Sequence, residues 1–225
     1  MRLLNAHSLE LANFEGREIP RYVILSHTWE KEGEVTFEDL LKNDHKHKRG
    51  YSKIEECRRL TISHYCDWFW VDTCCIDKSS SAELSEAINS MYAWYQRAEN
   101  CIVYLADVPN VPISKSRWYS RGWTLQELLA PSWVEFYDAS WKYIGTRDSM
   151  LNLISETTGI GTVFLEYRYK IKKASIALKL SWASQRQTSR EEDMAYCLMG
   201  LLDVICHCYM EKVALRHSIG FRKSS

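Results

Sequence analysis

Segment 116–131 brings a carboxylate, two arginines and two tryptophans together at a predicted helix. Leucines recur at helical spacing in its second half, which indicates a short helix with one buried face. Glu127 follows Trp123 by four residues, so both side chains should project from nearly the same side of that helix. With Arg117 and Arg121 close in sequence, the carboxylate could be a tuned acid, a nucleophile or the anchor of a structural salt bridge. Ion-pair networks also produce such clusters, so the sequence alone favours the salt bridge.

Two apolar runs predict buried strands that end in polar side chains. Residues 21–26 form the first run, which ends in Ser26 and is followed by His27. Residues 67–72 form the second run and end in Asp72. Ligand crevices of open α/β sheets form at the carboxyl ends of the strands, so these three side chains are candidates for lining one.

Other site chemistries find less support in the sequence. Cys74 or Cys75 could act as a thiol nucleophile with His27 as base, but buried packing of the two thiols is the favoured interpretation. The chain contains no glycine-rich phosphate loop. The run 206–208, Cys-His-Cys, lacks a second pair of ligands nearby, so we predict no metal site.

The order of apolar patterns predicts an α/β fold with a mainly parallel central sheet flanked by helices, of the flavodoxin-like kind, with a C-terminal helical extension. The expected strands are 22–26, 68–72, 101–105 and 133–136, with a further short strand at 141–144. The expected helices are 51–66, 82–98 and 123–129, followed by helices within 147–204. The capping-box pattern of residues 80–83 marks the start of the second helix.

The charge and composition of the chain argue against several classes of partner. The formal net charge is zero, so no long-range attraction to nucleic acid is expected. No apolar run approaches the ~20 residues of a membrane-spanning helix, and no signal peptide is evident. Eight cysteines without a secretory signal favour reduced, buried thiols. We therefore expect a cytoplasmic protein that binds neither nucleic acid nor membrane.

Four segments stand out by their residues, order and spacing: 22–29, 70–78, 121–131 and 190–200. Together they resemble the fungal heterokaryon incompatibility (HET) domain. The resemblance covers residues 1–204, with a sheet-bearing part at about 20–146 and a helical extension at about 147–204. It implies a cell-death effector or signalling domain in fungal allorecognition or innate immunity. The implied partners are further copies of the chain or an upstream receptor of the NLR type.

The HET domain is in turn distantly similar to TIR domains, some of which cleave NAD. That similarity maps the catalytic glutamate of those enzymes, within W-x-x-x-E, onto Glu127. It implies an NAD glycohydrolase without a cofactor, in which NAD is the substrate. Arg117 or Arg121 would meet the pyrophosphate, Trp123 would wall the site, and the side chains at the strand ends would line it. The alternative is a non-catalytic module that self-associates or binds a protein partner.

One observation separates the two functions. Burial of Glu127 against Arg117 or Arg121 without an adjacent cavity would favour the interaction module. A cleft shared by Glu127 and the three side chains at the strand ends would favour the enzyme.

Residues 205–225 depart from the family pattern. At this point the family resembles N-M-P-L-L-Y-G-E-G, whereas this chain reads Ile-Cys-His-Cys-Tyr-Met-Glu. Regrouping codons that encode the latter gives Met-Pro-Leu-Leu-Tyr-Gly, so we interpret 205–225 as a frameshifted or mis-spliced tail. Sequencing the transcript would test this interpretation.

Overall fold

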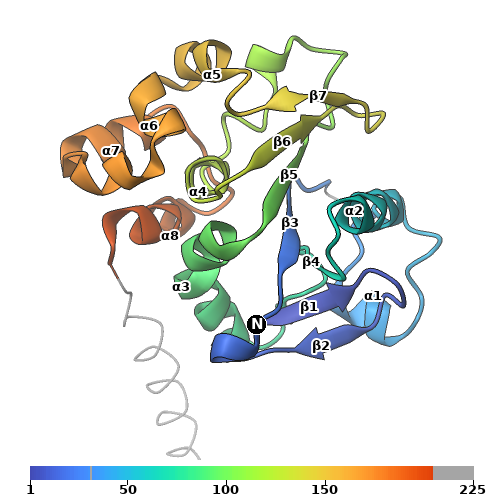
Figure 1. The fold of residues 1–225 in the computed structure, drawn as a ribbon. Coiled ribbons are helices and arrows are strands. Elements are labelled where there is room, and N and C mark those ends of the chain that lie inside the picture. The colour runs from blue at the N-terminus through green and yellow to red at the C-terminus, as the bar shows by residue number, and fades with distance from the viewer. Residues whose placement is uncertain (31, 205–225) are drawn as a thin grey trace, which may run out of the picture.

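A computed structural model describes residues 1–30 and 32–204, in which helices cover both faces of one sheet (Figure 1). The sheet has seven strands in the order β2-β1-β4-β3-β5-β6-β7. The strands are β1 (Arg2–Asn5), β2 (Leu11–Asn13), β3 (Tyr22–His27), β4 (Trp68–Trp70), β5 (Asn100–Tyr104), β6 (Val134–Tyr137) and β7 (Tyr143–Thr146).

The four central strands are parallel to one another, which confirms the predicted fold class. β3 pairs in parallel with both β4 and β5, and β5 pairs in parallel with β6. Their order β4-β3-β5-β6 is the 2-1-3-4 order of flavodoxin-like sheets. The outer pairings, of β1 with β2 and β4 and of β7 with β6, are antiparallel. The sequence analysis did not predict β1 and β2, which extend the sheet at one edge.

α2 packs on one face of the sheet, and α3 and α4 lie on the other, with α8 packed against both of them (Figure 1). The α-helices are α1 (Phe37–Leu41), α2 (Tyr51–Ser63), α3 (Ser81–Arg97), α4 (Thr124–Leu129), α5 (Leu151–Thr158), α6 (Thr162–Glu166), α7 (Ile176–Ala183) and α8 (Glu191–Leu202). Short 3-10 helices are η1 (Gly16–Glu18), η2 (Ile113–Lys115) and η3 (Arg168–Lys173). The predicted helical extension is present as α5 to α8.

The start of α3 uses half of the predicted capping box. The Ser80 hydroxyl accepts a hydrogen bond from the Glu83 backbone N–H at 3.3 Å. The Glu83 carboxylate does not return to Ser80. Its Oε1 accepts from the Asp77 backbone N–H at 2.8 Å and from Arg2 at 2.7 Å. Glu83 therefore ties the start of α3 to β1, an element that the local pattern could not reveal.

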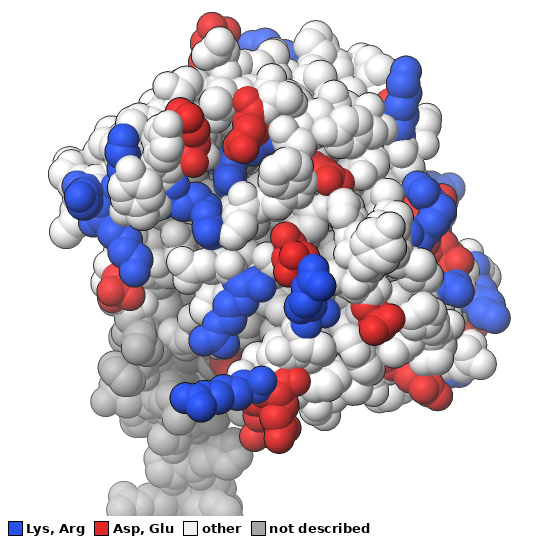
Figure 2. Space-filling model, viewed as in Figure 1, with Lys and Arg blue, Asp and Glu red and all other residues white. Residues whose placement is uncertain are grey.

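The predicted tail 205–225, with its Cys-His-Cys run, lies outside the described residues. Among the residues that are described, no cluster of histidine, cysteine or carboxylate side chains could hold a metal ion. Within the same part of the chain, no helix is long and apolar enough to cross a membrane. Acidic and basic side chains are largely interspersed over the face shown in Figure 2.

We expect Gly200→Ala to destabilise the protein, because α8 packs closely on α3 at this residue. A Cβ atom added at Gly200 would lie within 3.0 Å of both Cβ and Cγ of Tyr92. The Tyr92 Cβ is fixed by its backbone, so the two helices would have to separate. Such overpacking costs about 1–3 kcal/mol, measured as the loss of unfolding free energy in urea. Gly161→Ala is the control, since its nearest new contact would be an ordinary 3.7 Å. Equal stability of the two variants would contradict this packing.

Candidate functional site

Glu127 lies in the buried helix α4, and a residue of strand β3 holds its carboxylate in place. All six residues of α4 are buried, and Trp123 stands immediately before them as the N-cap. The Ser26 hydroxyl, at the end of β3, donates a hydrogen bond to Oε2 of Glu127. The indole N–H of Trp118 donates to the Ser26 oxygen at 2.8 Å. The Glu127 carboxylate is therefore positioned through one oxygen, and no hydrogen bond is observed from a described residue to Oε1.

Burial raises the pKa of Glu127 from the ordinary carboxyl range to about 7, although Ser26 and Arg121 oppose the shift. The sequence analysis favoured Glu127 as the anchor of a salt bridge, and that interpretation is wrong. No cation of the described chain forms a salt bridge with Glu127, whose side-chain partner is instead the Ser26 hydroxyl. A carboxyl with a pKa near neutrality can exist in both protonation states under physiological conditions.

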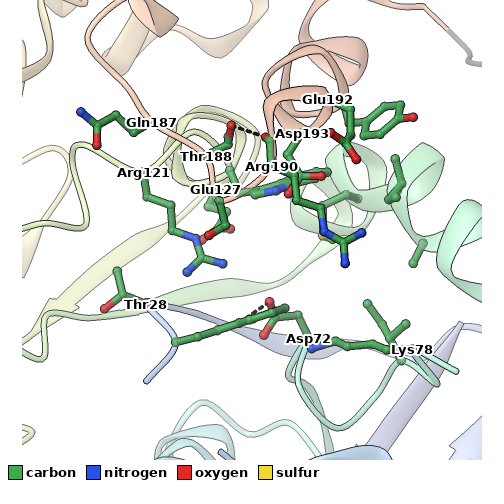
Figure 3. A pocket seen from close by; sticks show the side chains of 18 of the residues that line it. Thr28, Asp72, Lys78, Arg121, Glu127, Gln187, Thr188, Arg190, Glu192 and Asp193 are labelled. Atoms are coloured by element: carbon green, nitrogen blue, oxygen red, sulfur yellow. Dashed lines mark hydrogen bonds between the residues drawn. The ribbon is translucent and has the colours of Figure 1, made fainter. Parts of the chain in front are cut away.

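A cavity of about 680 Å³ opens beside Glu127 (Figure 3). Of the predicted site residues, five line it: Asp72, Arg117, Arg121, Trp123 and Glu127. Ser26 and His27 do not line it, but each contacts a residue that does. The wall opposite the strand ends comes from the segment before α8 and from the start of that helix. Its residues are Gln187, Thr188, Ser189, Arg190, Glu192, Asp193 and Tyr196.

Asp72 is a fixed anion in the wall of this cavity. His27 and Asp72 share a hydrogen bond of 3.1 Å, and the Trp29 indole N–H donates to the other carboxylate oxygen at 2.9 Å. Burial would raise the pKa of Asp72, but the hydrogen bond and charge of His27, together with Lys78, lower it to about 2. The two carboxyl groups of the cavity therefore differ in charge near pH 7, with Asp72 ionised and Glu127 partly protonated.

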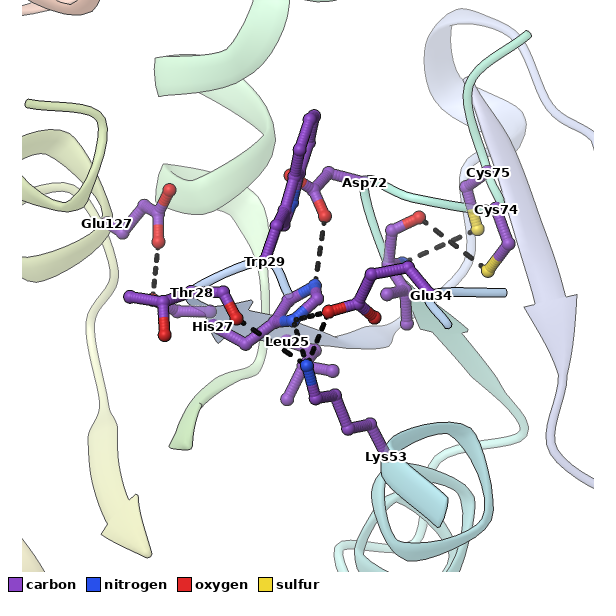
Figure 4. A network of polar contacts seen from close by, with 12 residues as sticks. Leu25, His27, Thr28, Trp29, Glu34, Lys53, Asp72, Cys74, Cys75 and Glu127 are labelled. Atoms are coloured by element: carbon purple, nitrogen blue, oxygen red, sulfur yellow. Dashed lines mark hydrogen bonds and ion pairs between the residues drawn. The ribbon is translucent and has the colours of Figure 1, made fainter. Parts of the chain in front are cut away.

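Behind His27 lies a polar network that the sequence analysis missed (Figure 4). The Lys53 ammonium pairs with Glu34 at 2.5 Å and lies 3.4 Å from His27 Nδ1. Lys53 and His27 are almost fully buried, at 3% and 4% exposure. The network braces the His27 ring, and His27 in turn holds Asp72. Lys53 and Glu34 lie on separate segments of mixed composition, so no local sequence pattern could predict that they form an ion pair.

A backbone ladder joins the segment before α8 to the residues that precede α4. The Gly122 N–H donates to the Gln187 carbonyl at 2.8 Å, and the Gln187 N–H donates to the Ser120 carbonyl at 2.7 Å. Buried Arg186 donates to the Arg121 carbonyl at 2.9 Å. A Cβ atom on Gly122 would meet Thr188 at 2.5 Å, so glycine permits this close approach. The ladder positions Arg121 in the cavity.

The cysteines do not support thiol catalysis. Cys74 and Cys75 are 0% and 2% exposed. Burial raises the pKa of Cys74 well above its ordinary value, which disfavours the nucleophilic thiolate. Both sulfur atoms contact backbone atoms of Val71. Packing beneath the strand end, the favoured interpretation of the sequence, agrees with this environment.

We expect Ser26→Ala to raise the pKa of Glu127 further, because the lost hydrogen bond favours the ionised carboxylate. The shift can be followed by carbon NMR of protein labelled at glutamate. Ser120→Ala is a matched control, since Ser120 also lines the cavity but its hydroxyl donates to the Arg117 carbonyl at 2.9 Å. An unchanged or lowered pKa in Ser26→Ala would contradict the assigned hydrogen bond.

Comparison with known proteins relates the chain to a described family. The sequence profile of the family described as "Heterokaryon incompatibility protein (HET)" matches residues 22–111. The vegetative incompatibility protein HET-E-1 of Podospora anserina is 44% identical over an alignment of 200 residues, which covers 83% of this chain and 15% of that relative. The chain thus spans a small part of the length of the curated relative. No solved structure matches this chain.

Proposed function

Because the chain belongs to the heterokaryon incompatibility family, we propose that it is a cell-death effector domain of fungal allorecognition or immunity that hydrolyses NAD. The proposal covers residues 1–204 as one functional domain, acting in the cytoplasm. The observation that carries the enzymatic part is the cavity beside Glu127. Its carboxyl is buried, has a pKa of about 7 and keeps Oε1 available to a ligand. The resemblance to TIR domains supplies the reaction class.

In the proposed reaction, the bond between nicotinamide and ribose breaks, and nicotinamide leaves as a neutral base with the bonding electrons. Water adds to the ribose C1′ and releases one proton. The transition state resembles an oxocarbenium ion, so it needs an anion more than it needs an acid. Ionised Glu127 would supply that charge through Oε1, while Trp123 would limit the access of water. Arg117 or Arg121 would meet the diphosphate.

The proposal is tested by incubating purified protein with NAD and measuring released nicotinamide. Because the reactive form of Glu127 is the anion, the rate should rise as the pH increases through about 7 and then level off. Absence of nicotinamide release across this range, with the protein folded, would reject NAD hydrolysis for this chain acting alone.

A non-catalytic interaction module is the second candidate, and an exposed surface favours it. Ile176 and Leu180, one turn apart on α7, are 66% and 46% exposed. Tyr167 and Tyr169, which precede α7 in the chain, are also exposed, and Lys170 contacts both rings. Basic side chains gather over this part of the molecule at the left of Figure 2. Exposed apolar side chains of this kind fit a partner such as a second copy or an NLR-type receptor.

A further inference from the structure

Four basic side chains line the cavity without a carboxylate partner. Among the described residues, no salt bridge involves Lys78, Arg117, Arg121 or Arg190. The buried Lys53 ammonium, by contrast, is paired with Glu34. Carboxyl groups line the cavity as well, and none of them forms a salt bridge with these four cations. The Asp72 carboxylate is hydrogen-bonded to His27 and Trp29 instead. The lining carboxyl groups are those of Glu30, Asp72, Glu127, Glu192 and Asp193. Convergent cations that form no salt bridge, in a concave site, favour an anionic ligand.

Trp29 holds two of these cations in place. The Lys78 Nζ lies 3.6 Å from the centroid of the Trp29 ring, and the Arg121 Cζ lies 5.1 Å from it. The ring itself is anchored by its hydrogen bond to Asp72. A cation–π contact fixes a charge without cancelling it, whereas a salt bridge would neutralise it. The two cations are therefore positioned in advance and still carry their charge toward a ligand.

Arg190 completes the set from the opposite wall. Figure 3 shows the guanidinium groups of Arg121 and Arg190 pointing into the space that Lys78 borders from below. The three side chains come from the loop after β4, the residues before α4 and the residue that caps α8. Guanidinium groups present several donors in one plane, which suits the oxygens of phosphate. A cavity of about 680 Å³ lies within the usual size range of small-molecule and cofactor sites.

We propose that Lys78, Arg121 and Arg190 form the binding site for the diphosphate of a dinucleotide, with Trp29 as the platform that presents Lys78 and Arg121. This inference rests on the proposed function for the identity of the dinucleotide. It adds two cations and a supporting ring that the sequence motifs did not assign. It also predicts that a substrate without the diphosphate, such as nicotinamide riboside, gains nothing from these side chains.

The test is calorimetric titration of the whole chain with ADP-ribose, which carries the diphosphate but no bond to cleave. Lys78→Met and Arg190→Met should each weaken binding about tenfold, because each removes one charge-assisted contact. Lys78→Arg, which keeps the charge, should retain most of the affinity. Lys170→Met is the matched control, since Lys170 also contacts an aromatic ring but does not line the cavity. Thermal unfolding of each variant checks that it is folded.

Unchanged affinity in folded Lys78→Met and Arg190→Met would overturn the inference, as would a parent protein that does not bind ADP-ribose at millimolar concentration. A failure of the proposed function would give a different experimental result from a failure of this binding site. A parent that binds ADP-ribose through Lys78 but releases no nicotinamide would retain the binding site and reject the hydrolysis. A parent that cleaves NAD with the same KM in Lys78→Met and Arg190→Met would retain the hydrolysis and reject this binding site.

Discussion

Glu127→Ala should lower NAD hydrolysis at least about a hundredfold while the protein stays folded. The substitution removes the carboxylate that faces the cavity and leaves the Ser26 hydroxyl without its acceptor. Since the anion acts mainly in the transition state, the loss should fall on kcat more than on KM. Released nicotinamide, measured at several NAD concentrations, separates the two constants.

Glu127→Gln is the closer variant, because it keeps an acceptor for Ser26 and removes the charge. It should be as inactive as Glu127→Ala. Glu135→Gln is a matched control, since Glu135 is also a buried carboxylate with hydrogen-bond donors but does not line the cavity. Parental NAD consumption by folded Glu127→Ala would remove Glu127 from the site. Toxicity that persists in cells with unchanged NAD would favour the interaction module.

Lys53→Met should cost about 3–5 kcal/mol of unfolding free energy, the largest stability effect we expect. The substitution leaves the Glu34 carboxylate, whose side chain is 12% exposed, without the ammonium that neutralises it. It also removes the cation beside His27 Nδ1, so the ring that holds Asp72 loses part of its support. Urea denaturation of the parent and the variant measures the difference.

The double variant Lys53→Met/Glu34→Gln isolates the cause. The glutamine can still accept from the Glu30 N–H, as Glu34 does at 2.9 Å, but no buried charge remains unpaired. It should recover most of the lost stability. Lys42→Met, which breaks the exposed pair with Glu38, should change the unfolding midpoint little. If Lys53→Met is as stable as the parent, the buried ion pair does not carry the stability assigned to it.

The parallel part of the sheet could be predicted because its strands are short, mostly buried and largely apolar runs. β3 and β5 lie at the centre, where both faces are covered, so their patterns are continuous. β1 and β2 were missed, since three or four residues at a sheet edge show too little alternation to distinguish a strand from a loop. β4 ends at Trp70, before the predicted Asp72, because the chain turns at once into the loop before α3.

The candidate site was predictable where a motif carried it. Glu127, Asp72 and Arg121 belong to segments whose residue types stood out, and all three line the cavity. Trp118 lay in the same segment as Glu127, yet its role depends on Ser26, 92 residues away. Arg190 is the first residue of one of the four family segments, but only the tertiary fold places its side chain near Lys78. Pairings across the sheet depend on tertiary structure, and no local pattern encodes them.

The ladder between Gln187 and the residues before α4 has a consequence for dividing related chains into fragments. Every strand of the sheet is complete by Thr146, so a fragment cut there would retain the whole sheet. It would lose Arg186 and the Gln187 carbonyl that accepts from the Gly122 N–H. It would also lose the cavity wall that includes Arg190. Arg121 would then face solvent without the hydrogen bonds that fix its backbone. A fragment intended to keep this cavity must extend at least through Tyr196, some fifty residues beyond the last strand.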